Sequence, residues 1–423
     1  MRNPVHHLLP VAAACVALAT AGLSAETVEL AGRAAIPDPA SPPPWTEIPA
    51  ATRRHFNLGH MVFNAKWQPA GHESQLVGLG PLFVENSCAA CHEGGARGLP
   101  PAAAGGLSSS FVLQLGGPAT AYGDVLNTRA IEGHQPEGRI AVTLQQREGQ
   151  YADGQRWTLR DPRYVVDSPP PRLPADTVLK PRIGPQVFGV GLLDAVPLPA
   201  LEAIRNAQAP SVRGDIGGRF GWQGTAMSLV DQTAIAFARE MGLTSPILSR
   251  DDCTQAQPHC LEAPQAGTPE LPEDLFHAVN TFQFMLAAPA RGKIDPAADA
   301  AGAALFERTG CAACHVPQLP VPRDAGDIRI DPYTDLLLHD LGEPLADRTV
   351  AGTPVPSRWR TAPLWGLAHA LKAGPVGLMH DGRASSIEEA ILWHEGQGAE
   401  ARRRFMAMDA ASRRQLLAWV ESL

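Results

Sequence analysis

The sequence contains the same five residues twice, Cys-Ala-Ala-Cys-His at positions 88–92 and again at 311–315. In the pattern C-x-x-C-H, two thiols can form thioether bonds to the vinyl groups of a haem, and the adjacent histidine can bind the iron. Two matches in one chain rarely arise by chance. The repeat therefore predicts two covalently attached c-type haems, bound through Cys88, Cys91 and His92 and through Cys311, Cys314 and His315.

Paired cysteines also occur in zinc sites and in redox-active disulfides. Two C-x-x-C pairs could form a four-cysteine zinc site, and a single pair could be a redox-active disulfide. Neither explains why a histidine follows both pairs directly. In an exported protein, moreover, thiolates tend to be oxidised rather than to hold zinc.

The remaining cysteines indicate the redox state of the compartment in which the protein is located. Apart from Cys15, only Cys253 and Cys260 lie outside the two motifs. They fall in the polar, proline-containing segment 251–272, where a small disulfide loop is expected. Such a disulfide is typical of an oxidising compartment.

The first 25 residues are expected to be a secretory signal peptide. Residues 8–23 are almost wholly apolar, and the small residues Ser24 and Ala25 place a cleavage site before Glu26. The alternative is a lipoprotein signal in which Cys15 carries the lipid. Export predicts a periplasmic protein, and since no later run of eighteen apolar residues follows, no membrane span is expected.

Composition and charge exclude some partners. The formal net charge is −8, charged residues make up 18%, and Lys and Arg are not clustered, so nucleic acid and anionic membranes are poor candidates. A length of 423 residues with 44% hydrophobic residues indicates more than one folding unit, and 40 Gly and 40 Pro indicate many loops.

The two motifs divide the chain into four parts after the signal peptide. They are a proline-rich arm (26–50), an N-terminal cytochrome c-like domain (51–225), a helical linker with the disulfide loop (226–297) and a C-terminal cytochrome c-like domain (298–423). Apolar periodicity predicts helices at 228–241, 275–286, 298–309, 387–394 and 412–423. Residues 94–175 are expected to form loops and short hairpins. The predicted fold is mainly α, with extensive loops and a few short strands, in two cytochrome c-like domains that each carry one covalent c-type haem.

Several strings between and after the motifs carry a family resemblance. They include Pro136-Glu-Gly-Arg139, Tyr151-Ala-Asp-Gly154, Gly218-Arg-Phe-Gly-Trp222, Trp359-Arg-Thr-Ala-Pro-Leu-Trp365 and His380-Asp-Gly-Arg383. Together with the two motifs, over roughly residues 50–423, they resemble the di-haem oxidoreductase family, also described as thiol oxidoreductase-like. That family is related to the bacterial di-haem cytochrome c peroxidases and MauG.

The resemblance implies different roles for the two haems. The N-terminal haem, on His92, would react with peroxide, and the C-terminal haem, on His315, would transfer electrons. Similar enzymes place the sixth ligand of the second haem, a Met or Tyr, fourteen residues after the His of the H-D-G motif. That position is occupied here by His394, which we expect to bind the iron; exchanging a thioether for an imidazole lowers a haem potential.

The resemblance also implies a distal acid–base site at the first haem. The superfamily uses a Glu with a Gln ten residues earlier, and the matching residues here are Glu137 and Asn127, so the amide is shorter. A carboxylate beside peroxide can take its proton and return it to the leaving oxygen. His134 is the further candidate, either as an acid–base group or as a reversible iron ligand.

The remaining implied features concern the surroundings of the haems and the reaction. Arg360 and Arg383 suit haem propionates, His339 and His380 are candidates for the same contacts, and a calcium ion between the haems is a further implied cofactor. The expected partners are hydrogen peroxide and an electron-donor protein or an oxidisable protein substrate. The predicted function is that of an exported, peroxidase-like di-haem oxidoreductase. A non-catalytic di-haem electron carrier and a di-haem dehydrogenase of a sulfur compound are the alternatives.

Overall fold

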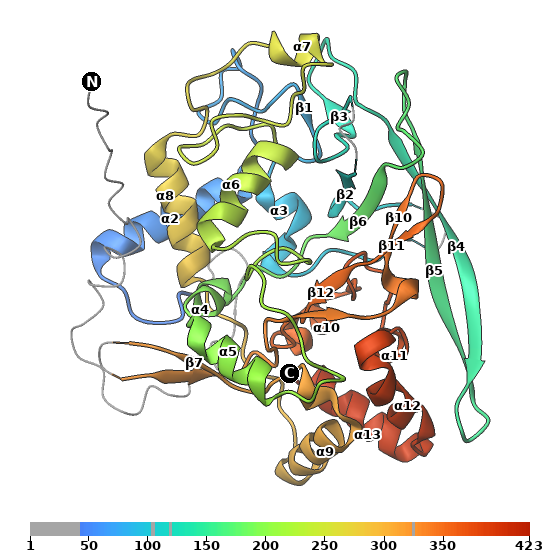
Figure 1. The fold of residues 1–423 in the computed structure, drawn as a ribbon. Coiled ribbons are helices and arrows are strands. Elements are labelled where there is room, and N and C mark those ends of the chain that lie inside the picture. Colours follow the sequence, from blue (N-terminus) through green and yellow to red (C-terminus); the bar gives the residue numbers. More distant parts are fainter. Residues whose placement is uncertain (1–42, 103–105, 118–120, 324–325) are drawn as a thin grey trace, which may run out of the picture.

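The computed structural model describes residues 43–423, except 103–105, 118–120 and 324–325. The predicted signal peptide, residues 1–25, and most of the predicted proline-rich arm lie outside the described residues. Figure 1 shows the path of the chain. Within the described part, no helix is both long enough and apolar enough to cross a bilayer.

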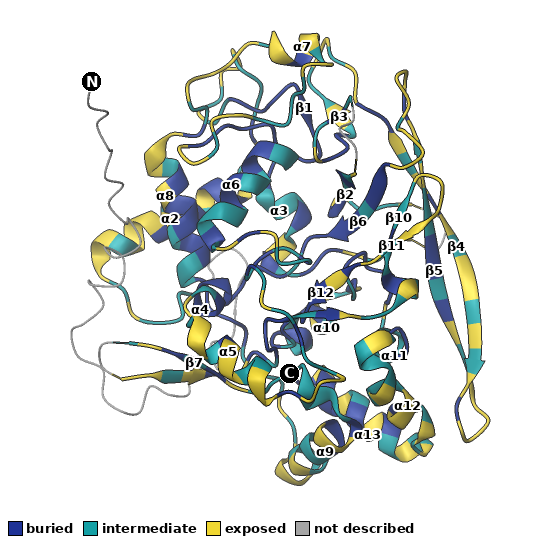
Figure 2. Cartoon of the chain, in the orientation of Figure 1, coloured by how far each residue is buried: buried dark blue, intermediate teal, exposed yellow. Residues whose placement is uncertain are grey.

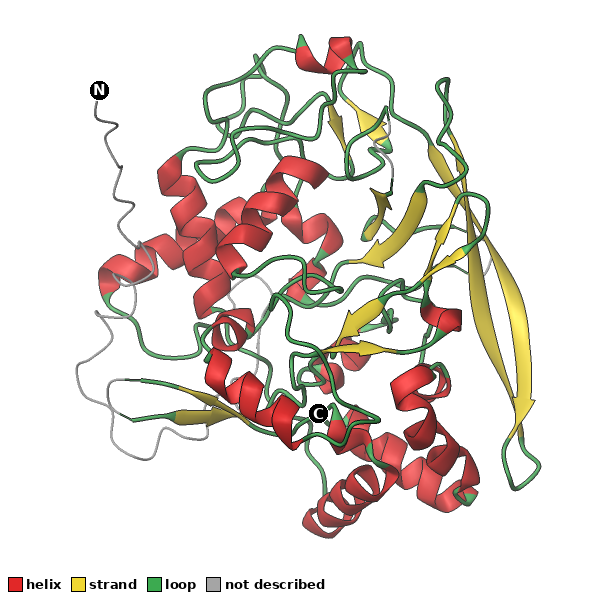
Figure 3. Cartoon of the chain, viewed as in Figure 1, coloured by secondary structure: helices red, strands yellow, loops and turns green. Residues whose placement is uncertain are grey.

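The helices lie mostly in two groups, one at the upper left of Figure 3 and one at the lower right. The α-helices are α2 (Ala50–Asn64), α3 (Cys88–Cys91), α4 (Val190–Asp194), α5 (Leu198–Ala207), α6 (Leu229–Glu240), α7 (Pro258–Leu261), α8 (Glu273–Met285), α9 (Pro296–Thr309), α10 (Leu367–Ala373), α11 (Ile387–Leu392), α12 (Ala399–Ala407) and α13 (Ala410–Glu421). Single 3-10 turns are η2 (Glu93–Gly95), η3 (Cys311–Ala313), η4 (Glu343–Leu345) and η5 (Gly396–Gly398).

The helices predicted from the sequence are confirmed, with slightly different bounds, as α6, α8, α9, α11 and α13. Helix α6 has a clear start and end signal in its sequence. The Ser228 hydroxyl accepts a hydrogen bond from the Asp231 N–H, and the Asp231 carboxylate accepts one from the Ser228 N–H, which forms a capping box. After the helix, Gly242 adopts a φ of +65° that favours glycine.

The strands form several small antiparallel sheets. Their bounds are β1 (Leu82–Phe83), β2 (Phe111–Gly116), β3 (Arg129–Ala130), β4 (Arg139–Gln150), β5 (Arg156–Asp167), β6 (Val178–Ile183), β7 (Leu319–Val321), β8 (Ile328–Ile330), β9 (Leu338–Asp340), β10 (Asp347–Thr349), β11 (Pro354–Val355) and β12 (Arg358–Arg360).

The prediction of a mainly α fold was wrong. Of the described residues, about 33% are helical and 18% are in strands. The largest omission is the β4–β5 ribbon, which runs from the pair Arg139–Asp167 to the pair Gln150–Arg156 and lies along one edge of the molecule. Glycine and proline content made this region look like loops, although Val142 and Leu144 alternate with Thr143 and Gln145, a pattern typical of a strand.

One four-stranded sheet joins distant parts of the chain, in the order β11-β10-β6-β2. Strand β6 pairs with β2 over the register Phe111–Ile183 to Gly116–Val178, and on its other edge with β10 from the C-terminal third. The C-terminal segment therefore completes a sheet that begins in the N-terminal half.

The two largest hydrophobic cores among the described residues lie in the two groups of helices, where Figure 2 shows many dark blue segments. In the first core, α2 packs on α8, with the Phe63 and Phe282 ring centroids 5.3 Å apart. Gly59 permits this approach, because a Cβ there would lie 2.0 Å from the Ala278 carbonyl oxygen. The second core includes Trp419 of α13, whose ring centroid lies 5.0 Å from that of Phe306 on α9.

Candidate functional site

The first C-x-x-C-H motif folds into the single turn α3. Ser87 caps this turn, since its hydroxyl accepts a hydrogen bond from the Ala90 N–H at 3.2 Å. Side chains three residues apart share one face of a helical turn. Cys88 and Cys91 therefore present two free thiols to the same side, with Cys91 buried and Cys88 half-buried.

His92 follows the turn with one ring nitrogen fixed. Its Nδ1 donates a hydrogen bond to the Pro185 carbonyl oxygen at 2.7 Å, and burial lowers the pKa of the imidazole to about 4. Gly184 makes room for the ring, because a Cβ there would lie 2.8 Å from its Cε1 atom. The neutral ring keeps its Nε2 lone pair, which is the arrangement of a metal-binding histidine.

A cavity of about 280 Å³ opens beside these three residues, bounded by β2, β6, α6 and the segment after β12. His92 is the one histidine in its described wall, and Met241 supplies the one thioether. Burial raises the pKa of Glu240, at the end of α6, to about 7. The charged side chains of the wall are those of Glu85, Asp124, Lys180, Arg182, Arg219, Arg239, Glu240 and Arg360.

Two buried arginines at this site have no carboxylate partner among the described residues. Arg360 is 7% exposed, its Nε donates to the Gly221 carbonyl oxygen, and its Nη1 has no hydrogen-bond partner. Arg97 is 9% exposed and donates to the Pro363 carbonyl oxygen. Burial lowers the pKa of both guanidinium groups to about 10, with the Arg360 charge adding to the effect on Arg97. Unpaired buried cations are costly, so this end of the site is suited to an anionic group.

The second motif follows α9 without a break. Gly310 ends the helix with a φ of +95°, and η3 then carries Cys311. His315 repeats the geometry of the first motif, since its Nδ1 donates to the Tyr333 carbonyl oxygen at 3.0 Å and burial lowers its pKa to about 4. Its Nε2 is likewise left free.

The structure brings His394 to His315. His394 follows α11, and its Nδ1 donates to the Ala390 carbonyl oxygen at 2.7 Å. The two imidazole centroids lie 6.4 Å apart, with the ring planes inclined at 56°. Each ring thus has Nδ1 held by the backbone and Nε2 left over.

Beside the second motif is the single group of three metal-ligand side chains found among the described residues, Cys314, Asp335 and His339. The Cys314 sulfur lies 3.7 Å from His339 Nδ1, and His339 Nε2 donates to the Asp335 carboxylate at 2.8 Å. The four motif cysteines do not form a common cluster, so the described residues contain no four-cysteine zinc site.

The other residues singled out from the sequence lie in buried pairs. His380 stacks on Trp359, with ring centroids 3.8 Å apart and planes inclined at 14°. Arg383 is paired with Asp381 at 2.9 Å, and both are buried. Unlike Arg360, Arg383 is therefore already paired with a carboxylate, that of Asp381.

The structure also brings Glu137 and Asn127 together. Glu137 is buried, and its Oε2 accepts a hydrogen bond from the Asn127 N–H at 2.6 Å. Burial raises the pKa of this carboxyl to about 7, although hydrogen bonds to it act in the opposite direction. Glu137 is not part of the cavity wall, but Val125 is, and it accepts a hydrogen bond from the Asn127 amide at 3.4 Å.

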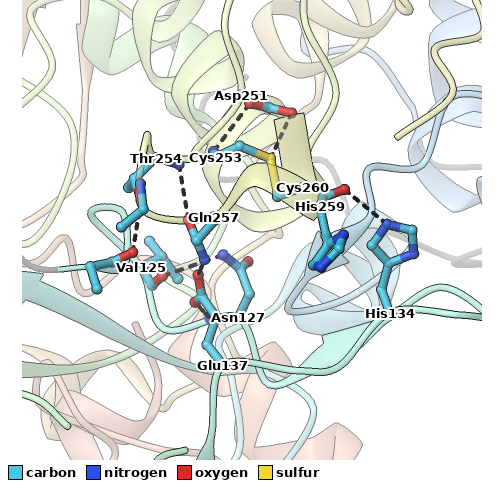
Figure 4. The surroundings of a disulfide bond; sticks show 12 residues. Val125, Asn127, His134, Glu137, Asp251, Cys253, Thr254, Gln257, His259 and Cys260 are labelled. Carbon is cyan, nitrogen blue, oxygen red and sulfur yellow. Dashed lines mark hydrogen bonds between the residues drawn. A yellow bond between two sulfur atoms is a disulfide. The ribbon is translucent and has the colours of Figure 1, made fainter. Parts of the chain in front are cut away.

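His134 is placed apart from that carboxylate. It is half-buried, and its Nε2 donates to the His259 carbonyl oxygen at 3.1 Å, next to the disulfide loop (Figure 4). The predicted disulfide between Cys253 and Cys260 is confirmed, with Cα atoms 5.7 Å apart.

Sequence reasoning missed the residues that hold the functional side chains in place. They are the carbonyl groups of Pro185 and Tyr333, which bind the two motif histidines, and the side chain of Gln257, which donates to Glu137. No local pattern marks them, because each is distant in sequence from its partner, or acts through a backbone atom that every residue has.

Two separated C-x-x-C-H motifs, each with a buried imidazole that keeps one nitrogen free, describe a redox protein with two sites for metal-bearing groups. Residues 215–423 match the model of the family described as "Di-haem oxidoreductase, putative peroxidase". This region is similar to the di-haem oxidoreductase family, whose name implies haem as a cofactor. The matched range contains the second motif and His394, and the first motif lies before it.

Among solved structures, hydrazine synthase of Kuenenia stuttgartiensis, pressurised with 20 bar xenon, is similar at 11% identity, with 100% of each chain covered and a TM-score of 0.41. No protein of curated function matches the chain.

Proposed function

We propose that this di-haem oxidoreductase is a periplasmic c-type protein that reacts with hydrogen peroxide at an N-terminal haem and exchanges electrons through a C-terminal haem. The observation that carries the proposal is the repeated geometry of the two motifs. In each, two thiols lie beside a neutral histidine whose Nδ1 is held by a backbone carbonyl group. When bound, haem iron supplies the centre that reacts with peroxide and that accepts and donates single electrons.

The first site has residues suited to both the iron and the propionates of a haem. The thiols of Cys88 and Cys91 would attach the macrocycle, and His92 Nε2 would bind its iron. The guanidinium of Arg360, whose Nη1 has no partner, would balance the propionates, and the nearby Arg97, which has no carboxylate partner, would add to that positive charge. This assigns Arg360 the role expected from the sequence and leaves Arg383 with Asp381.

The second site fits a haem bound by two imidazoles. Two imidazoles could together hold the iron of one haem only where both rings keep a free nitrogen and lie close together. The centroids of His315 and His394 are 6.4 Å apart. Such a pair would leave no open position, so this site is suited to electron transfer and the first site to substrate.

Glu137 would serve as the acid–base group at the first site. A carboxyl group whose pKa is about 7 can both accept and return a proton near neutral pH. The Asn127 N–H fixes one carboxylate oxygen, and the Asn127 amide reaches the cavity wall at Val125.

The second candidate function is electron transfer without catalysis. Met241 lies in the wall of the first cavity, and a thioether there could close the sixth position of that haem as His394 would close the other. Both sites would then be unreactive toward peroxide.

Spectroscopy on the purified, haem-loaded protein separates these functions. A pyridine haemochrome assay should count two haems per chain, and the ferric EPR spectrum should contain a high-spin signal that disappears with peroxide. Glu137→Gln should slow that reaction by about 10²-fold or more, while Glu132→Gln, an exposed neighbour, should leave the rate unchanged. Two low-spin haems inert to peroxide would establish the electron carrier instead, and a chain without haem would refute both.

A further inference from the structure

The disulfide loop lies directly over the Glu137 carboxyl group. The loop is closed between Cys253 and Cys260, and backbone hydrogen bonds tighten it, from the Gln257 N–H to Thr254 O at 2.9 Å and from the Cys260 N–H to Gln257 O at 2.9 Å. Figure 4 shows the Gln257 side chain pointing from this loop to Glu137.

Both ends of the Gln257 amide are used. Its Nε2 donates to Glu137 Oε1 at 2.5 Å, and its Oε1 accepts a hydrogen bond from the Thr254 N–H at 2.9 Å. Because a backbone N–H can only donate, the amide oxygen must face Thr254, and the amide N–H groups must face the carboxylate. Thr254 is itself anchored, since its hydroxyl donates to the Ala121 carbonyl oxygen at 2.7 Å.

A second contact ties the same segment to the wall of the first cavity. The Asp252 carboxylate accepts hydrogen bonds from the N–H groups of Asp124 at 3.0 Å and Val125 at 2.9 Å. Both of these residues line the cavity. Gly123 permits this approach, because a Cβ there would lie 2.2 Å from the Asp252 carboxyl carbon.

We propose that Gln257, held by the disulfide loop, is the positioning residue that orients Glu137 and sets its affinity for protons. It supplies, from a distant part of the chain, a side-chain N–H to one carboxylate oxygen at 2.5 Å, while the Asn127 backbone N–H binds the other oxygen at 2.6 Å. The consequence for catalysis rests on the proposed function of Glu137, but the effect on its proton affinity does not.

The direction of the effect follows from the charges around the carboxylate. Burial and the nearby Asp252 charge favour protonated Glu137, whereas the hydrogen bonds from Asn127 and Gln257 favour the ionised form. The other titratable groups on the loop and beside it are Asp251, His259, His134, Asp124 and Arg239, the last two forming an ion pair. Removing the Gln257 donor leaves those groups in place, so Glu137 should bind its proton more tightly.

The test measures the proton on Glu137 directly in the haem-loaded protein. The infrared band of its protonated carboxyl is identified by its loss in Glu137→Gln and followed against pH. In Gln257→Leu, the proton affinity should rise by about tenfold or more, the scale of a hydrogen bond to a charged group. Gln255→Leu, an exposed amide two residues away in the same loop, should leave the titration unchanged.

A double variant with Cys253→Ser and Cys260→Ser keeps Gln257 but opens the loop, and should shift the titration in the same direction by a smaller amount. An unchanged titration in both Gln257→Leu and the double variant would overturn the proposal. If the titration shifts while the pH profile of peroxide reactivity does not, the positioning role stands and the catalytic role of Glu137 fails. If both shift together, both stand.

Discussion

At the scale of single residues, the proposed binding of iron by His394 would set the redox potential of the second site. Imidazole stabilises the oxidised haem more than a thioether does, so histidine–histidine ligation gives a lower potential than histidine–methionine ligation. His394→Met should therefore raise the midpoint potential of the second haem by on the order of 100 mV. A redox titration followed by absorption measures this shift, and the potential of the haem on His92 should not change.

The matched control is His369→Met. His369 is a half-buried histidine on α10, outside both C-x-x-C-H motifs. The substitution should leave both potentials in place. Equal potentials in His394→Met and in the natural chain would show that His394 does not bind the iron, and the 6.4 Å separation of the rings would then be a packing contact.

The residues that sequence alone could predict are those whose chemistry is encoded in adjacent positions. Cys88, Cys91 and His92 form a contiguous pattern, and the structure places them together on one cavity wall. Gln257 could not be predicted as a partner of Glu137, because the two are 120 positions apart and are joined only by the tertiary fold. Arg360 could be predicted as a propionate-binding residue because arginine pairs with carboxylates. That its Nη1 has no hydrogen-bond partner is seen only in the structure.

At the scale of elements, strands β6 and β10 are joined by a buried ion pair. The Arg182 guanidinium donates to both carboxylate oxygens of Asp347 at 2.8 Å, and both residues are buried. Asp347→Ala would leave the Arg182 charge buried without a partner, so the free energy of unfolding should fall by about 3–5 kcal/mol. Urea unfolding measures the loss.

The control removes an ion pair from the exposed ribbon instead. Glu148→Ala frees Arg156, and both side chains are largely exposed, so the free energy of unfolding should change by less than about 1 kcal/mol. If Asp347→Ala costs no more than Glu148→Ala, the ion pair is not what joins β10 to β6.

The same pair predicts how stability depends on acid. Burial alone would raise the pKa of Asp347, but the Arg182 charge and hydrogen bonds outweigh it and lower the pKa below its ordinary value. The stabilisation is therefore complete above the unfolded-state pKa of about 3.9 and is lost as pH falls through the lower folded-state value. In urea titrations from pH 6 to pH 2, Asp347→Asn should be the less stable protein near neutrality. Its deficit should shrink below about pH 4, whereas a deficit independent of pH would contradict the assignment.

Elements could be predicted where one segment carries its own signals. Helix α6 was located from its apolar periodicity, and the structure adds a capping box at Ser228 and a terminating Gly242 directly at its ends. The β4–β5 ribbon has a weaker signal, because most of its side chains are at least partly exposed and only a few, such as Val142 and Leu159, are buried. Strands β10 and β11 are shorter still, and they form only because β6 offers an edge.

At the scale of the whole molecule, each hydrophobic core contains residues from both ends of the chain. The first core, built mainly on α2, α6 and α8, includes buried residues that follow the second motif, among them Leu319, Ile330 and Leu337. The second core, built on α9 and α13, includes Tyr151 and Leu159 from the ribbon. With β10 added to the N-terminal sheet, the N-terminal and C-terminal parts of the chain exchange segments, which couples their stabilities.

This exchange predicts that the chain unfolds as one cooperative unit. Leu337→Ala removes a fully buried side chain of the first core that comes from the C-terminal part, and Leu416→Ala removes one from the second core. Each should lower the free energy of unfolding by about 2–5 kcal/mol, while Leu198→Ala, an exposed position on α5, should cost little. In every variant, far-ultraviolet circular dichroism and tryptophan fluorescence should report the same urea midpoint, because a shared core cannot be lost from one unit alone. Two separated transitions, with Leu416→Ala moving only one of them, would show instead that each unit keeps its own stability despite the exchanged segments.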